Sequence, residues 1–294
     1  MNPPVKFWQN HKSWDEADQA WDERAKKLAE TSPLKTFKKN PNLPGIRKKT
    51  RKYLPWKTLA YLHDHDYSGK LEKHFWKHPI KHGLGLLGSL LKSENYKRDG
   101  DFFIYGLEDL NDFETKLKAP KTVLVAGFSY CHKPFECPAG RFTDACSHDI
   151  DHPVCGQCFI GKCVHSLPET QVVPLFITTV HYIGEQMLEA QKNWPKHDIF
   201  FLITACELTL EMFSNIGVAV DMRGIGVRLD GQICNTMRAF EASEFGVKPG
   251  MAIVTDETQG RMMSLLKIFA ETSATCHSTP QKKPDNIIAT DAPN

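Results

Sequence analysis

Residues 122–130 read TVLVAGFSY, and this stretch decides the fold class. Its apolar residues follow one another without polar alternation, which is typical of a strand covered on both faces. A second stretch of this kind, DIFFLITA, occupies residues 198–205. Amphipathic helical patterns lie within residues 172–193 and again from residue 206. The sequence therefore predicts an α/β fold, with a mixed or parallel sheet covered by helices.

Charge divides the chain around its middle. Residues 1–120 carry 23 Lys/Arg and 16 Asp/Glu, whereas the remainder carries 14 and 19. We expect a basic, mainly helical N-terminal region over residues 1–119 and a cysteine-rich α/β domain over residues 120–276. The polar residues 277–294 are predicted to form a disordered tail.

The N-terminal region starts with a clear helix signal. Ser13 and Glu16 form a capping box, and Trp14 and Trp21 share one helical face. Residues 35–52 hold eight basic residues and no acidic one, which predicts an extended, solvated linker.

A basic region of this kind can bind a nucleic acid or an anionic membrane surface. Aromatic residues are sparse within the basic run, so nucleic acid is disfavoured as a partner. Residues 78–93, HPIKHGLGLLGSLLKS, combine a short apolar face with basic flanks. Such a helix can lie on a membrane surface or pack on the second half of the chain.

The sequence shows no stretch near the roughly 20 apolar residues of a spanning helix. Its start, MNPPVKFWQNHKSWDE, has no apolar signal core, so we expect a cytoplasmic protein. Cytosolic thiols are kept reduced. The nine cysteines therefore indicate metal binding or redox chemistry rather than structural disulfides.

Six cysteines gather directly after the first strand, in the loop CHKPFECPAGRFTDACSHDIDHPVCGQCFIGKC of residues 131–163. Cys155 and Cys158 form a C-x2-C pair, which can place two sulfurs on one ion, with Gly156 relaxing the turn. Only one such pair is present, and the spacing matches neither of the two common ferredoxin patterns. The loop thus predicts a thiolate site without fixing its type.

Two further cysteines follow elements of the predicted sheet. Cys206 lies where DIFFLITA gives way to a helix, and Cys234 precedes the helical stretch NTMRAFEA. A helix N-terminus lowers the pKa of a thiol, so both are candidate reactive cysteines as well as candidate small core residues. Because open α/β sheets bind ligands at their strand ends, both can also complete the site of the loop.

We interpret the eight cysteines as candidate ligands of an iron–sulfur cluster, or of two: Cys131, Cys137, Cys146, Cys155, Cys158, Cys163, Cys206 and Cys234. Glu207, His148 and His152 are candidate proton donors or outer partners. The alternatives are a zinc-stabilised binding module and a thiol–disulfide oxidoreductase that uses Cys155 and Cys158. Under the cluster hypothesis the protein transfers electrons to a redox partner or reduces a small molecule.

Short stretches of residues 120–250 resemble a known family. They are VAGFSYC, CPAG, CGQC, ITACE and GQICNT. The chain resembles the bacterial and archaeal domain-of-unknown-function family numbered one hundred and sixteen. That resemblance implies a cysteine-rich metal- or cluster-binding module and leaves its reaction open. Members of the family often begin with apolar membrane segments, whereas residues 1–119 here are basic.

Overall fold

The computed structural model describes residues 6–35, 46, 48–91, 95–217 and 221–276. Its main sheet has six strands in the order β1-β2-β6-β5-β3-β4. The strands are β1 (Lys97–Asp99), β2 (Phe102–Tyr105), β3 (Thr122–Ser129), β4 (Val172–Ile177), β5 (Asp198–Ala205) and β6 (Arg223–Arg228). Four of them, β4, β3, β5 and β6, run parallel, and β2 and β1 extend the sheet as an antiparallel edge.

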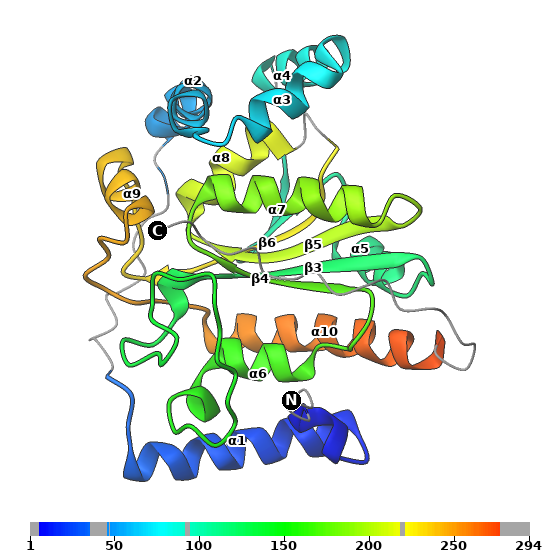
Figure 1. Ribbon diagram of the computed structural model, residues 1–294, viewed down its shortest axis with the longest axis vertical. Helices are drawn as coiled ribbons and strands as arrows, with labels where there is room; N and C mark the ends of the chain where they lie inside the picture. The colour runs from blue at the N-terminus through cyan, green and yellow to red at the C-terminus, as the bar shows by residue number, and fades with distance from the viewer. Residues whose placement is uncertain (1–5, 36–45, 47, 92–94, 218–220, 277–294) are drawn as a thin grey trace.

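Helices cover both faces of this sheet (Figure 1). One face is covered by α7 (Val180–Asn193) and α8 (Glu207–Gly217), and the other by α5 (Leu110–Leu117), α6 (Phe159–Ser166) and α10 (Asp256–Cys276). This arrangement confirms the predicted α/β fold with a mixed sheet.

The central strand β3 shows why its sequence is continuously apolar. Leu124, Ala126 and Phe128 belong to the core beneath α6 and α10, whereas Val125 belongs to the core beneath α7 and α8. A Cβ on Gly127 would lie 2.7 Å from Cγ2 of Ile203, so only glycine fits that close approach between strands.

The N-terminal region contributes both a helix that packs on the sheet domain and two strands that extend its sheet. Helix α1 (Trp14–Thr31) packs outside α6, and the predicted cap is confirmed, since Ser13 Oγ accepts the backbone N–H of Glu16 at 3.2 Å. Two of the six strands, β1 and β2, also come from before residue 120, in the region that the sequence describes as mainly helical.

Three helices cover the opposite end of the molecule: α2 (Lys48–His65), α3 (Lys70–Lys77) and α4 (Pro79–Leu91). The predicted linker over residues 35–52 is therefore too long, because α2 already begins at Lys48. Leu54 and Tyr61 are buried in a core cluster with α8 and α9 (Met237–Glu244), and this burial favours the helix. Residues 36–45 and 47, like the predicted tail 277–294, lie outside the described residues.

Short elements complete the structure: the 3-10 turns η1 (Phe7–Asn10), η2 (Tyr130–His132) and η3 (Cys155–Gln157), and a two-stranded sheet of β7 (Asp230–Gly231) and β8 (Ala252–Ile253). Among the described residues, no helix is both long and apolar enough to cross a lipid bilayer.

Candidate metal centre

The cysteine loop leaves the sheet at the carboxyl end of β3. Four of its thiols, from Cys137, Cys146, Cys155 and Cys158, line one small, largely enclosed cavity. We call this space the cysteine cavity. Its wall also includes Lys133 and His148. The structure thus brings together half of the predicted ligands.

A buried lysine organises the first half of the loop. Lys133 is 2 % exposed, and its Nζ donates to the carbonyl oxygens of Thr143 at 2.8 Å and Ala145 at 2.7 Å. A further bond, at 3.3 Å, reaches the carbonyl oxygen of Gly140. Gly140 stands at φ 79° and closes the turn that starts at Cys137. One ammonium group therefore ties together the turns that carry Cys137 and Cys146.

The second half of the loop is built from η3 and the start of α6. Cys158 precedes the first residue of α6, and its backbone N–H donates to the carbonyl oxygen of Cys155 at 3.1 Å. Burial raises the pKa of the Cys158 thiol to about 12, opposed by backbone N–H groups of Gly161 and Ile160 that donate to its sulfur. Burial likewise raises the pKa of Cys155 to about 11.

Two glycines in this half of the loop, Gly156 and Gly161, lie where neighbouring atoms leave no room for a side chain. Gly156 lies against α1, where an added Cβ would meet Cδ1 of Leu28 at 2.6 Å. A Cβ on Gly161 would meet the carbonyl oxygen of Cys155 at 2.7 Å. Neither glycine has a positive φ, so the predicted role of Gly156 in relaxing the turn is replaced by a packing role.

Side chains do not form a ready single-ion site here. Within the described part of the chain, no group of three or more His, Cys, Asp or Glu side chains is arranged to hold one metal ion.

Cys163 has a different environment from its neighbours in the loop. It is fully buried in the core beneath the sheet, and its Sγ lies 3.8 Å from Sδ of Met263 on α10. The helical period of α6 places Cys163 with Ile160 on the face that packs on the core.

The other three predicted ligands form a second group. Cys206 and Cys234 interact directly through their thiols, and Nζ of Lys248 lies 3.3 Å from Sγ of Cys234. We call Cys206 and Cys234 the thiol pair. Cys131 is close enough for Lys248 and Cys234 to influence its pKa, which burial raises.

The predicted outer partners divide in the same way. His148 lines the cysteine cavity, and its Nδ1 lies 3.0 Å from the carbonyl oxygen of Cys146. Nδ1 of His152 accepts the backbone N–H of Val154. The buried carboxylate of Glu207 instead pairs with arginines, at 3.3 Å from Arg98.

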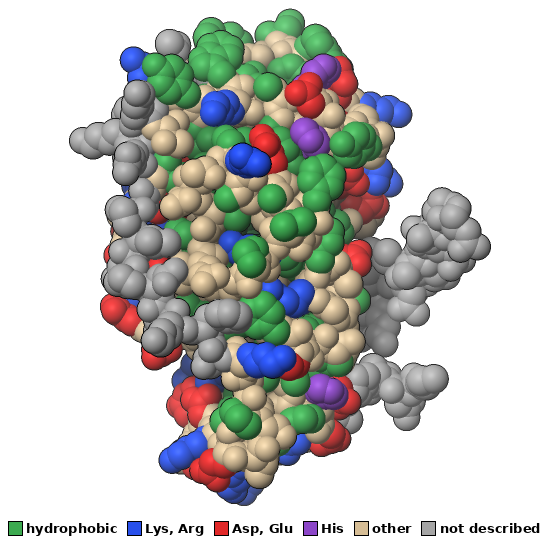
Figure 2. Space-filling view, turned by 90° about the vertical axis from the view of Figure 1, so that its left-hand side faces the viewer, with side chains coloured by type: hydrophobic (Ala, Val, Ile, Leu, Met, Phe, Trp, Pro, Cys, Tyr) green, Lys and Arg blue, Asp and Glu red, His purple; other side chains and the backbone are tan. Residues whose placement is uncertain are grey.

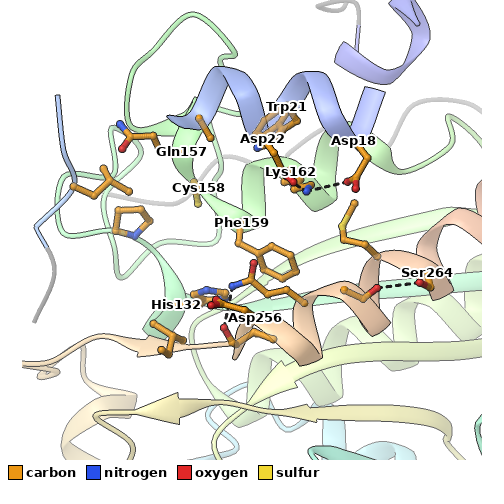
Figure 3. A pocket seen from close by; sticks show the side chains of 18 of the residues that line it. Asp18, Trp21, Asp22, His132, Gln157, Cys158, Phe159, Lys162, Asp256 and Ser264 are labelled. Atoms are coloured by element: carbon orange, nitrogen blue, oxygen red, sulfur yellow. Dashed lines mark hydrogen bonds and ion pairs between the residues drawn. The ribbon is translucent and has the colours of Figure 1, made fainter. Parts of the chain in front are cut away.

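A larger cavity of about 670 Å³ lies beside the cysteine cavity, between α1, α6 and α10 (Figure 3). Cys158 and Pro134 line both cavities. Trp21 and Phe159 give the larger cavity aromatic walls, and Lys162 pairs there with Asp18 and Asp22.

His132 stands in the wall of the larger cavity (Figure 3). Burial lowers the pKa of its imidazole to about 4, so the ring is neutral at physiological pH. Its Nδ1 is buried and has no hydrogen-bond partner among the described residues. A buried polar atom without a partner is costly, and a bound molecule could satisfy it.

Lys133, His132 and the α1 wall are functional candidates that the sequence did not single out. Lys133 carries no motif, because three of its four acceptors are backbone carbonyls that any residue supplies, and the fourth is the hydroxyl of Thr143. The cavity beside α1 depends on a contact between segments more than 100 residues apart, as in the bond from Arg24 to the carbonyl oxygen of Ile150.

Comparisons with known proteins give no relative: no family model, no curated protein and no solved structure matches this chain. The resemblance to family one hundred and sixteen therefore stays a prediction.

Proposed function

We propose that the chain is a cytoplasmic iron–sulfur protein whose cluster is bound by Cys137, Cys146, Cys155 and Cys158. The observation that carries this proposal is that these four cysteines line one small cavity. Four cysteine thiolates are the usual ligand set of an iron–sulfur cluster, and such a cluster supplies one-electron chemistry.

The surroundings of the cavity suit this role. Backbone N–H groups of Gly161 and Ile160 donate to the sulfur of Cys158, and hydrogen bonds to ligand sulfurs tune cluster potentials. The buried ammonium group of Lys133 lies beside the cavity and offsets part of the negative charge of four thiolates.

The neighbouring cavity supports an electron-transfer or reductive role on a small molecule. Cys158 belongs to the walls of both spaces, so a molecule in the larger cavity would lie next to a cluster ligand. Trp21 and Phe159 offer it aromatic surface.

Metal analysis after purification without oxygen tests the proposal. We expect a brown protein that absorbs at about 400 nm and contains iron and sulfide. A colourless protein with stoichiometric zinc would overturn the proposal and favour the zinc-stabilised module on the same four thiols. A protein without metal but with a reducible Cys155–Cys158 disulfide would support the thiol oxidoreductase instead.

Two variants locate the site. Cys155→Ser should lose bound metal, whereas Cys163→Ala should retain it, because the Cys163 thiol faces the core beside Met263 and not the cavity. Retention of metal by Cys155→Ser would show that the cavity is not the centre.

We propose, in addition, that helices α2, α3 and α4 bind an anionic membrane surface. Large apolar side chains are exposed across these helices, and Figure 2 shows hydrophobic groups gathered at this end of the molecule. They are Tyr53, Trp56, Tyr67, Trp76, Ile80, Leu84 and Leu87, each at least 52 % exposed. Ile80, Leu84 and Leu87 follow the helical period and form one stripe on α4.

Charge on the same helices identifies the partner. Exposed lysines flank the apolar side chains on all three helices: Lys52, Lys57, Lys73, Lys77 and Lys81. Tryptophan beside lysine is typical of helices that lie in the interface of an anionic bilayer. Each basic residue near such a surface contributes about 1 kcal/mol of attraction.

Sedimentation with vesicles tests this second proposal. The purified chain should bind phosphatidylserine-containing vesicles and bind pure phosphatidylcholine vesicles much more weakly. A Trp56→Ser/Trp76→Ser variant should bind about tenfold more weakly per tryptophan removed. A Val247→Ser variant is the control, since this exposed side chain follows α9 and is not part of helices α2, α3 and α4. Vesicle binding that the tryptophan changes leave unaltered would overturn the proposal. A concentration-dependent dimer that these changes abolish would also overturn it, because the apolar side chains would then form a contact between two copies of the chain.

A further inference from the structure

The thiol pair lies outside the cysteine cavity and plays no part in the proposed cluster site. Cys206 follows β5 and precedes α8, and its backbone carbonyl oxygen accepts the N–H of Leu210 at 3.0 Å. Its Sγ lies 3.1 Å from Oγ1 of Thr209, in the first turn of α8. Cys206 is therefore fixed at a helix N-terminus.

Cys234 reaches the same place from the segment between β7 and α9. The helix begins only at Met237 with Thr236 as its cap, so Cys234 does not stand at the helix N-terminus as the sequence suggested. Its partners are instead the Cys206 thiol, the Lys248 ammonium group at 3.3 Å and the carbonyl oxygen of Ala239, which accepts from Sγ at 3.4 Å while the thiol is protonated. Cys234 is 4 % exposed, and Cys206 is half-buried.

We propose that Cys206 and Cys234 form a redox-active dithiol that reduces a small disulfide by thiol–disulfide exchange. Cys206 and Cys234 pack in one core cluster and their thiols interact, so a disulfide between them is sterically accessible. A lysine held against one of them provides the charge that an attacking thiolate needs. The low exposure of Cys234 limits the substrate to small molecules.

The ionisation of the pair supports this assignment of roles. The Cys206 hydrogen bond, together with Lys248, lowers the pKa of Cys234 to about 5. Cys206 keeps its proton, because its bond to Cys234 and its burial raise its pKa well above the usual value. The sequence suggested a reactive Cys206 at the helix start. Ionisation of one thiol disfavours ionisation of the other, and Lys248, at 3.3 Å from Sγ of Cys234, favours the thiolate on Cys234.

Other titratable groups also face the pair. The carboxyl of Glu244 lies near Cys234, and burial raises its pKa to about 7. Cys131 approaches from the end of β3, and burial raises the pKa of its thiol. Tyr130 also lies near Cys234, and Lys248 is a cation near both Cys131 and Cys234.

The exchange balances as two displacements. The Cys234 thiolate attacks one sulfur of the disulfide, that S–S bond breaks, and the first substrate thiolate leaves. Cys206 then loses its proton to that thiolate and attacks the Cys234 sulfur, which expels the second substrate thiolate. Two electrons pass from the protein thiols to the substrate, which leaves as one thiol and one thiolate, and the Cys206–Cys234 disulfide remains.

Oxidised glutathione is the probe for the test, applied to the full chain purified without oxygen. Acid and N-ethylmaleimide stop the reaction, and tryptic peptides are analysed without reduction. Cys206 and Cys234 fall in different peptides, 197–223 and 229–238, and each peptide contains one cysteine. We expect these two peptides to become crosslinked with the loss of two hydrogens, as two glutathiones are released.

Variants separate the roles of the two thiols. Cys206→Ser should trap a glutathione on peptide 229–238, because the resolving thiol is gone. Cys234→Ser, or Cys234→Ala as a second variant, should lower the reaction of Cys206 at least tenfold. Far-UV circular dichroism checks that each variant is folded.

Lys248 is a positioning residue, and its test uses pH. At pH 6, Lys248→Met should slow the formation of the crosslink about tenfold, and Lys248→Arg should restore most of it. Raising the pH to 9 should reduce the effect of Lys248→Met, because Cys234 then ionises without help. Lys192→Met, at an exposed site on α7, is the control and should leave the rate unchanged.

Three results would overturn the proposal. In the first, glutathione stays on Cys234 of the unaltered chain without a crosslink. In the second, Cys206→Ser and Cys234→Ser react equally. In the third, Cys234→Ser loses bound metal as Cys155→Ser does, which would make the pair a ligand set. The metal content of Cys155→Ser alone decides the cluster proposal, so the two proposals can fail separately.

Discussion

The cysteine cavity and the thiol pair are built from the same residue type, yet their thiols ionise in opposite ways. Burial raises the pKa of Cys158 to about 12, whereas the bond from Cys206 and the Lys248 charge lower the pKa of Cys234 to about 5. Each group also has a lysine close by. Cys234 differs from the cavity thiols in two contacts: the bond from Cys206, which is the larger cause of its lowered pKa, and the nearby charge of Lys248.

Lys133 donates its hydrogens to carbonyl oxygens of the loop, while Lys248 directs one to a sulfur. In the cavity the cation thus stabilises the backbone, and burial raises the pKa values of the Cys146, Cys155 and Cys158 thiols. In the pair the cation stabilises a thiolate without a metal. The ionisation of a cysteine thiol therefore depends on which atoms a neighbouring cation contacts, and not only on whether a cation is near.

The largest expected effect separates the two groups by metal content. Cys158→Ser should lower bound iron at least tenfold, because it removes a ligand that borders both cavities. Cys234→Ser should keep the iron of the unaltered chain. Elemental analysis after anaerobic purification measures both. Equal losses in the two variants would mean that the two groups form one site.

The next effect concerns Lys133 as the organiser of the loop. Lys133→Met should lower the free energy of unfolding by about 3 kcal/mol, because three backbone carbonyls lose a buried donor. Urea denaturation of the metal-free protein measures the loss. The exposed Lys192→Met is the control and should change stability by less than about 0.5 kcal/mol. A loss equally small for Lys133→Met would show that water replaces the ammonium group.

Most of the fold could be predicted from the sequence, because strands buried on both faces leave continuous apolar runs. TVLVAGFSY and DIFFLITA became adjacent parallel strands, β3 and β5. The antiparallel edge was not predicted, since β1 is only three residues long and fully exposed. Its pairing depends on β2 and β6, far apart in the chain.

The sequence predicts which cysteines are candidates for the site, but it does not predict which of them lie together in the structure. Cysteine spacing identifies the loop, but it cannot tell that Cys163 turns into the core while Cys158, five residues earlier, turns into a cavity. Helical periodicity in α6 was the one signal that could have separated them. The contact of Lys248 with Cys234 depends on tertiary folding and leaves no pattern in the sequence.

The pH dependence of the free energy of unfolding gives another test of the difference between the cysteine cavity and the thiol pair. The pKa of Cys234 is lower in the folded chain than its usual value near 9, so between about pH 5 and 9 the unfolded state binds more protons. Stability from this group therefore rises with pH and is lost as the pH falls toward 5, with a slope of at most about 1.4 kcal/mol per pH unit. For Cys155 and Cys158 the raised pKa has the opposite sign, and their contribution is lost above about pH 9.

Urea denaturation of the metal-free chain and of Cys234→Ala at pH 6, 7 and 8 isolates the thiol pair. The stability difference between them should grow with pH by roughly 1 kcal/mol per unit. Glu244, with a pKa raised to about 7, contributes the opposite slope; most of it cancels in the difference, because burial, the largest cause of its shift, is the same in both proteins, whereas the smaller part due to the Cys234 charge does not cancel. Parallel curves would show that Cys234 is not ionised in the folded state.

The smallest expected effect compares two glycines on either side of Cys158. Gly161 lies in the first turn of α6, where alanine would favour the helix by up to about 1 kcal/mol. Its Cβ, however, would meet the carbonyl oxygen of Cys155 at 2.7 Å, and a backbone atom cannot rotate away. Gly161→Ala should therefore cost about 1 kcal/mol overall, as overpacking outweighs propensity. A Cβ on Gly156 would clash with the end of the flexible Leu28 side chain and would lie 3.4 Å from the carbonyl oxygen of Ile150, an ordinary contact distance, so thermal unfolding of Gly156→Ala should change less. The reverse order would mean that contact with α1, and not the turn at Cys155, sets the geometry of the cavity.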